Sequence, residues 1–309
     1  MAEPVFRTIE ILVKAAIAVS GIKITFIGEE NIPERGGAVL AVNHTSYVDW
    51  VPAEYAATLR GRRLRFLIKA ELQQLRSINF VIKHVKLIPV DRTAGADAYA
   101  VAVERLRAGE LVGVHPEATI SRSFELREFK TGAARMAHEA GVPIIPVIVW
   151  GAHRIWTKDH PKSLWRSRIP ITVKIGAPIW PMDTLEKTQA ALREAMVRLL
   201  HETQESYPHP PGAYWVPRRL GGGAPTPEEA RLLDEAELAE RAKRAQSALG
   251  EGGSIDGAAG AARRIALRPS TSRNGGCTCI PTADKQGTSP DRAGVVGGAG
   301  VVERREQKG

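Results

Sequence analysis

Apolar runs of strand length alternate with longer stretches of helical periodicity along the first two thirds of the chain. The runs that predict strands are Lys23–Ile27, Ala38–Val42, Leu64–Ile68, Val85–Val90, Leu111–Val114, Ile144–Val149 and Ile171–Ile175. The stretches that predict helices are Val51–Arg60, Glu71–Ile82, Ala94–Ala108, Gly132–Ala140 and Thr184–Glu205. This alternation is typical of an α/β fold, with a central, mostly parallel or mixed sheet covered by helices on both faces.

The two ends of the chain differ from this central region. Residues 1–20 predict an amphipathic helix, whose apolar face either packs on the sheet or lies in the headgroup region of a membrane. We place the main domain at 21–208. No aromatic residue follows Trp215, so 209–309 is expected to be a low-complexity, largely disordered tail. Within it, the capping pattern that starts at Thr226 predicts one helix near 227–248.

Composition narrows the class of protein. Lys and Arg number 43 against 34 Asp and Glu, a formal net charge of +9 that suits an anionic partner such as nucleic acid, anionic lipid or a phosphorylated substrate. The two cysteines, Cys277 and Cys279, exclude a disulfide framework. The longest uncharged stretch, Ala140–His153, contains two prolines and falls short of the roughly 20 apolar residues of a spanning helix, so we expect a cytoplasmic protein.

A histidine and an acid follow the predicted strand Ala38–Val42. Positions five apart in one helix diverge by roughly 140°, so His44 must lie in the turn and Asp49 in the first helical turn for the side chains to meet. Such a pair suits a general base, because the carboxylate orients the imidazole and stabilises its charged form. Ser46 is a candidate covalent nucleophile. The alternative is a helix cap and an acid on the helix dipole.

Two further strands also end in polar groups. Arg92 follows Val85–Val90, while Glu117 and Arg122 follow Leu111–Val114. Arginine suits a phosphate because its guanidinium donates two parallel hydrogen bonds. Taken singly, each of these residues is equally compatible with a surface ion pair or a turn. Their joint position beyond strand ends favours a ligand site, since ligands of open α/β sheets bind there.

Four blocks in this region, in order, resemble the motifs of the 1-acylglycerol-3-phosphate acyltransferase family, the glycerolipid acyltransferases. The first resembles that family's histidine-four-residues-aspartate motif, and the third its Phe-Pro-Glu-Gly-Thr-Arg motif. The blocks are Asn43–Asp49, Pro89–Arg92, Pro116–Thr119 and Val142–Val147. With the flanking strands, the resemblance covers roughly residues 20–205 and leaves the tail outside.

The resemblance implies a role for each matching residue. His44 would be the general base oriented by Asp49, and the acceptor hydroxyl would attack the thioester of acyl-CoA or an acyl carrier protein directly, without an acyl-enzyme or a cofactor. The implied acceptor and phosphate site consists of Arg92, Glu117, Thr119 and Arg122. The residues implied to line the acyl site are Val142, Pro143, Ile144 and Pro146. The implied product is phosphatidic acid.

The third block departs from the family pattern at three positions. His115 replaces the usual aromatic, Ala118 the glycine, and Ile120 the arginine, so Arg122 is the candidate for the missing phosphate contact. A lysophosphatidate is the preferred acceptor, although another lysophospholipid or a glycolipid alcohol would fit a weaker phosphate site. His115 is a turn residue, an extra acid or base, or a metal ligand with Glu117 and His44. No short metal-binding spacing is present, so we expect no metal.

Because the implied substrate is a lipid, we expect a peripheral protein on the cytoplasmic face of an anionic membrane. A segment in which Trp150, Trp156 and Trp165 alternate with basic residues either rests at that surface or covers the edge of the core. Without a recognition-module motif, nucleic acid is not an expected partner. Two rival functions remain: an acyl hydrolase or thioesterase that uses the same His/Asp pair, and a non-catalytic lipid-binding protein.

Overall fold

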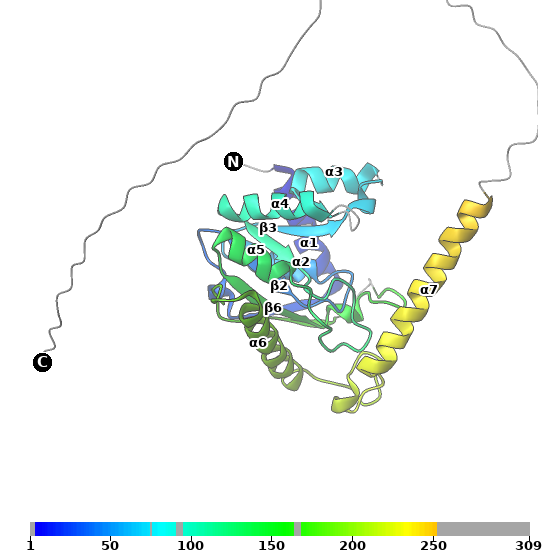
Figure 1. Cartoon of the computed structure of the whole chain (residues 1–309). Coiled ribbons are helices and arrows are strands. Elements are labelled where there is room, and N and C mark those ends of the chain that lie inside the picture. The colour runs from blue at the N-terminus through cyan, green and yellow to red at the C-terminus, as the bar shows by residue number, and fades with distance from the viewer. Residues whose placement is uncertain (1–3, 75, 91–94, 164–167, 252–309) are drawn as a thin grey trace, which may run out of the picture. The chain divides into compact units, whose positions relative to one another are not determined.

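The computed structural model describes residues 4–74, 76–90, 95–163 and 168–251, and a seven-stranded sheet forms its centre (Figure 1). The strand order is β1-β7-β6-β2-β5-β3-β4. The strands are β1 (Lys23–Ile27), β2 (Ala38–Val42), β3 (Leu64–Lys69), β4 (Ile88–Val90), β5 (Leu111–Val114), β6 (Ile144–Trp150) and β7 (Pro170–Ile175). Strands β6 and β7 pair antiparallel and the other neighbours pair parallel, so the prediction of a mixed α/β sheet is confirmed.

Helices cover both faces of this sheet (Figure 1). The described α-helices are α1 (Pro4–Ser20), α2 (Trp50–Leu59), α3 (Arg76–Val85), α4 (Gly95–Arg107), α5 (Gly132–Ala140), α6 (Leu185–Glu205) and α7 (Pro227–Glu251), of which α7 extends away from the sheet. On β2, Val39 and Ala41 pack in the core that contains residues of α4, α5 and α6, while Leu40 and its even-numbered neighbours pack with α2. Because both faces of β2 are buried, its sequence is apolar without interruption.

The start of β4 differs from the prediction. Helix α3 continues through Val85, which is buried, and Lys86 adopts a positive φ of 57° before the strand begins at Ile88. An apolar residue at the end of an amphipathic helix has the same local pattern as the first residue of a strand. The predicted strand Val85–Val90 is therefore shorter by three residues at its N-terminal end.

The boundary predicted at residue 208 falls too early. Trp215, Val216 and Ala224 are buried and belong to the main core, although the segment is rich in glycine and proline. A turn through Gly221, whose φ is 77°, brings this segment back onto the domain. Helix α7 follows, and the predicted tail beyond residue 251, with Cys277 and Cys279, lies outside the described residues.

Candidate active site

Asn43 fixes the start of the loop that follows β2. Its side-chain amide donates to the backbone oxygen of Val149 at 3.1 Å, and its Oδ1 accepts from the Val149 amide at 2.7 Å. This fully buried side chain thereby extends the β2–β6 pairing past the end of β2. Sequence reasoning assigned Asn43 no role, because the pairing joins it to a strand more than a hundred residues away.

Asp49 draws this loop back upon itself. Its Oδ2 accepts hydrogen bonds from the backbone amides of Thr45 and Ser46, at 2.8 and 2.7 Å. The same oxygen lies 3.4 Å from Nδ1 of His44. His44 is in the turn and Asp49 is at the start of α2, so the two side chains meet as the spacing predicts.

Burial controls the charge on both members of this pair. It raises the pKa of the Asp49 carboxyl to about 7, against the opposing effects of His115 and the two amide hydrogen bonds. Burial, together with the positive charges of Lys158 and Lys69, lowers the pKa of His44 to about 4. His44 is therefore neutral at pH 7, as a general base must be. The contact of Nδ1 with a carboxylate assigns the proton to Nδ1 and leaves Nε2 as the basic atom.

His115 supports the His44 ring from one side. The two imidazoles stack with centroids 3.9 Å apart and an angle of 11° between their planes. Nδ1 of His115 lies 3.0 Å from the backbone oxygen of Val42, to which it donates. Burial and the neighbouring His44 lower the pKa of His115 to about 3, so it is a neutral ring that takes the place of the family's aromatic. Among the described residues, no cluster of histidine, cysteine and acidic side chains is suited to hold a metal ion.

Glu117 connects the histidine loop to the loop after β5. One of its carboxylate oxygens accepts from the His44 backbone amide at 2.8 Å, and the other accepts from the Arg127 amide at 3.0 Å. Burial raises the pKa of Glu117 to about 8, opposed by these two hydrogen bonds. The Ser121 amide also donates to the His44 carbonyl, at 2.8 Å. The loop after β5 thus binds both the amide and the carbonyl of His44.

Ser46, the candidate nucleophile, is fully buried. Its hydroxyl lies 2.7 Å from the backbone oxygen of Trp156 and 3.1 Å from that of Ala152, and it accepts from the Val48 amide at 3.1 Å. These contacts use both the donor and an acceptor site of the hydroxyl. Ser46 therefore shapes the loop and is not positioned to attack a thioester.

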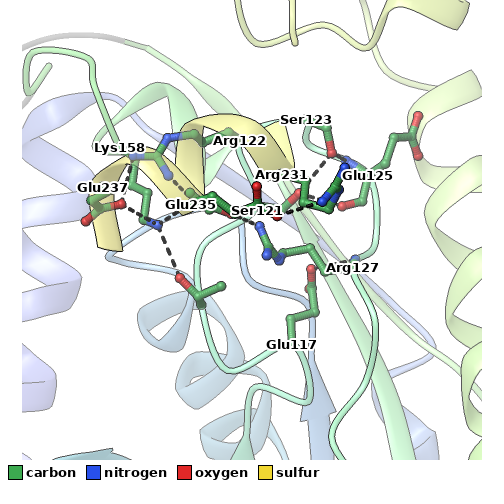
Figure 2. A network of polar contacts seen from close by, with 12 residues as sticks. Glu117, Ser121, Arg122, Ser123, Glu125, Arg127, Lys158, Arg231, Glu235 and Glu237 are labelled. Atoms are coloured by element: carbon green, nitrogen blue, oxygen red, sulfur yellow. Dashed lines mark hydrogen bonds and ion pairs between the residues drawn. The ribbon is translucent and has the colours of Figure 1, made fainter. Parts of the chain in front are cut away.

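The residues predicted to bind a phosphate differ from one another in their contacts. Arg92 lies outside the described residues. Thr119 accepts a hydrogen bond from Nζ of Lys158 at 3.2 Å. Arg122 is buried and pairs with acidic side chains, two of which come from α7 (Figure 2). Lys158 was part of the basic segment noted in the sequence, but its position beside Thr119 was not predicted.

The residues predicted to line an acyl site lie just before β6 and in its N-terminal half. Val142, Pro143, Ile144 and Pro146 are buried. Ile144 pairs with Val39, whereas His44 follows the opposite end of β2, about 16 Å along the strand direction at about 3.3 Å per residue. The structure therefore does not bring this group next to His44. In the basic segment, Trp150 belongs to the core and Trp165 lies outside the described residues.

The structure thus places a neutral imidazole next to a carboxyl group beyond the central strands of an α/β sheet, where ligands of such sheets bind. Residues 23–150 match the family model named acyltransferase. The chain is 31% identical over 217 residues to a probable 1-acyl-sn-glycerol-3-phosphate acyltransferase of Mycoplasma pneumoniae, covering 65% of this chain and 79% of that protein. The chain therefore belongs to the acyltransferase family, as the four sequence blocks predict, and is an enzyme of that class.

Further relatives agree with this assignment. The 1-acyl-sn-glycerol-3-phosphate acyltransferase of Bacillus subtilis is 29% identical, covering 60% of this chain and 88% of that protein. The Borreliella burgdorferi protein of the same name is 30% identical over 150 residues. The match covers 48% of this chain and 59% of that protein. The crystal structure of the 1-acyl-sn-glycerophosphate acyltransferase from Thermotoga maritima matches with a TM-score of 0.54 at 24% identity, covering 66% of this chain and 81% of that one, and supports the fold.

Proposed function

We propose that this enzyme transfers a fatty acyl group from acyl-CoA or acyl carrier protein to the free hydroxyl of 1-acylglycerol 3-phosphate, giving phosphatidic acid. The names of the relatives support the acceptor. The cations around Thr119 support an acceptor that carries a phosphate, because arginine and lysine are its usual protein ligands. The observation that carries the proposal is the buried Asp49 carboxylate 3.4 Å from His44 Nδ1.

The proposed reaction forms no acyl-enzyme. Nε2 of His44 accepts the proton of the acceptor hydroxyl as the oxygen attacks the thioester carbonyl, and Asp49 stabilises the imidazolium that forms. Collapse of the tetrahedral intermediate breaks the carbon–sulfur bond, and the proton passes from His44 to the departing thiolate. Direct transfer is consistent with Ser46, whose hydroxyl is occupied by backbone contacts.

Thiol release from acyl-CoA tests the proposal. With 1-oleoylglycerol 3-phosphate present, the full chain should release thiol, and His44→Ala should lower kcat by roughly 10²–10⁴-fold, the usual contribution of a general base. His84→Ala is the matched control, because His84 is exposed on α3. Unchanged turnover in His44→Ala would refute the mechanism.

Two other outcomes of the same assay separate the rivals. Release that needs no acceptor alcohol would identify a thioesterase instead. If acyl-CoA is inert, the assay is repeated with acyl carrier protein as the donor. Inactivity with both donors, combined with retained binding of the lysolipid, would identify the non-catalytic lipid-binding protein.

A membrane surface is the proposed location of this reaction. Helix α1 exposes Ile11, Leu12 and Val19, whereas its Phe6 is buried with Arg63 over the ring. An apolar helix face exposed on a basic protein suits the headgroup region of an anionic bilayer. No described helix has the length and apolar character needed to cross a membrane. Sedimentation of the full chain with phosphatidylglycerol vesicles, but not with phosphatidylcholine vesicles, tests this location.

A further inference from the structure

Three cations converge beside the active site and face the acidic side of α7 (Figure 2). Arg122 pairs with Asp234 and, at 2.9 Å, with Glu237. Arg127 also pairs with Asp234. Nζ of Lys158 lies 3.2 Å from the Asp234 carboxylate and 3.3 Å from that of Glu237. We call Arg122, Arg127 and Lys158 the cationic cluster.

Each member of the cationic cluster is connected to His44 through a short path. Arg122 follows Ser121, whose amide binds the His44 carbonyl. The Arg127 amide binds Glu117, which also binds the His44 amide. The charge of Lys158 contributes to the lowered pKa of His44. An anion bound at the cluster would therefore lie beside the general base.

The contact between α7 and the cluster is mainly electrostatic. Among the α7 positions whose side chains the structure describes, Ala230 and Asp234 are buried, while Leu232, Leu233 and Leu238 are exposed. Burial opposes ionisation of Glu237, but its hydrogen bond with Arg122 and the charge of Lys158 lower its pKa to about 2, so it is charged at neutral pH. The ion pairs with Asp234 are largely buried, so α7 leaves when another anion takes its place on the cations, and its departure exposes little apolar surface.

The charge balance changes when α7 leaves. With α7 in place, the three cations face three carboxylates: Asp234, Glu237 and Asp159, of which the last is on the same loop as Lys158 and pairs with Arg122. Without α7, Asp159 is the one carboxylate among the described residues that still forms an ion pair with the cluster. Two arginines and a lysine with one carboxylate form a site for a dianion, and a phosphate monoester supplies one.

We propose that the cationic cluster binds the anionic headgroup of the acceptor and that Asp234 and Glu237 are an internal anion that occupies the cluster until the acceptor displaces α7. The identity of the ligand rests on the proposed function, because the acceptor named there carries a phosphate. The position of Ile120 where the family has an arginine leaves this task to Arg122 and its two neighbours. Helix α7 thereby restrains the enzyme in the absence of acceptor.

The double variant Asp234→Asn/Glu237→Gln tests this restraint, since it removes both charges and keeps oxygen atoms that accept hydrogen bonds. The apparent KM equals the intrinsic value divided by the open fraction, so it is raised in a parent protein that is mostly closed. Relative to that parent, the double variant should show a KM for 1-oleoylglycerol 3-phosphate lowered about fivefold, with kcat unchanged. The KM for uncharged 1-oleoylglycerol should not change.

A matched control removes the same charge from the same helix. Glu235 and Glu240 pair with Arg231 and Arg244 of α7 itself and are mostly exposed. Glu235→Gln/Glu240→Gln should leave the KM for both acceptors unchanged. An equal decrease in KM in this control would show that general charge, and not release of the cluster, attracts the substrate, and would overturn the proposal.

Hydrogen exchange of the α7 amides supplies a readout that does not depend on turnover. In the full chain, 1-oleoylglycerol 3-phosphate and inorganic phosphate should accelerate exchange over residues 228–244, and 1-oleoylglycerol should not. Turnover without this acceleration would overturn the proposal that Asp234 and Glu237 occupy the cluster as an internal anion, and would leave the proposed function intact. Acceleration without turnover would support the anion site and refute the proposed function. A higher KM in Asp234→Asn/Glu237→Gln would show that α7 positions the arginines for catalysis, which also overturns the proposal.

Discussion

Replacing Asp49 by asparagine separates the charge of this residue from its geometry. Oδ2 accepts the amides of Thr45 and Ser46, whereas Oδ1 has no hydrogen-bond partner among the described residues. Only the carbonyl oxygen of asparagine can accept those amides, so it should take the Oδ2 position and place the NH2 group at Oδ1. The contact with Nδ1 of His44, and therefore its tautomer, should survive the substitution.

The loss in activity follows from the missing charge. A carboxylate 3.4 Å from an imidazolium stabilises it by about 5 kcal/mol at an effective dielectric constant of about 20. Because solvent and the remaining dipoles recover part of this energy, kcat should fall by roughly 10³-fold in Asp49→Asn. Asp49→Ala should be more damaging, since it also leaves the amides of Thr45 and Ser46 without their acceptor.

The free energy of unfolding of Asp49→Asn should rise at neutral and higher pH, although its activity falls. Burial raises the pKa of Asp49 from 3.8 to about 7, so the folded state retains a proton that the unfolded state has lost. The free energy of unfolding of the parent protein therefore decreases as pH rises from about 4 to 7, by up to about 4 kcal/mol at 1.36 kcal/mol per pKa unit. Asp49→Asn lacks this loss and should be the more stable protein at pH 8, with a smaller advantage at pH 4.

Urea unfolding followed by tryptophan fluorescence, at pH 4 and pH 8, measures this difference beside kcat. Asp97→Asn is the control, because Asp97 is an exposed acid in the first turn of α4. An Asp49→Asn protein that gains no stability at pH 8 relative to pH 4 would refute the account of its burial. One that retains full kcat would refute the role of its charge.

Two further predictions concern buried polar groups near α2. Ser46→Ala removes hydroxyl contacts to Trp156 and Val48 and should lower the free energy of unfolding by about 1–3 kcal/mol while turnover persists; a folded but inactive variant would instead indicate an acyl-enzyme. Burial raises the pKa of Glu54 to about 8 against its hydrogen bond with the Leu64 amide, so stability should decrease by about 1.4 kcal/mol per pH unit between pH 5 and 8 through this group. Glu54→Gln should lose that slope in urea titrations, and an unchanged slope would contradict the assignment.

The fold could be predicted where burial leaves a periodic pattern. The bounds of β1, β2 and β5 agree with the apolar runs, because each run is a buried or half-buried strand between turns. The start of β4 could not be predicted, because the buried residue Val85 belongs to helix α3 and not to the strand. The packing of Trp215 was missed for a related reason, since a glycine- and proline-rich composition does not distinguish tight turns from a disordered chain.

The candidate site divides in the same manner. His44 and Asp49 could be predicted because they are five residues apart on one strand-to-helix turn. The role of Glu117 could not, because it binds backbone amides that have no sequence signature, 73 and 10 residues away. Arg122 and Asp234 are 112 residues apart, and an ion pair between a loop and a distant helix leaves no periodic pattern in the sequence.

The departures in the third block have separate physical consequences. Ala118 has a φ of 58°, a left-handed conformation that explains the glycine usual at this position and costs an alanine roughly 1 kcal/mol. The turn is nevertheless retained, since the Ala118 amide binds the His115 carbonyl at 3.0 Å. Ile120 is buried and carries no charge that could contact a substrate. The alanine therefore preserves the geometry at a cost in stability, whereas the isoleucine leaves the phosphate contact that we propose to Arg122, the residue that pairs with α7.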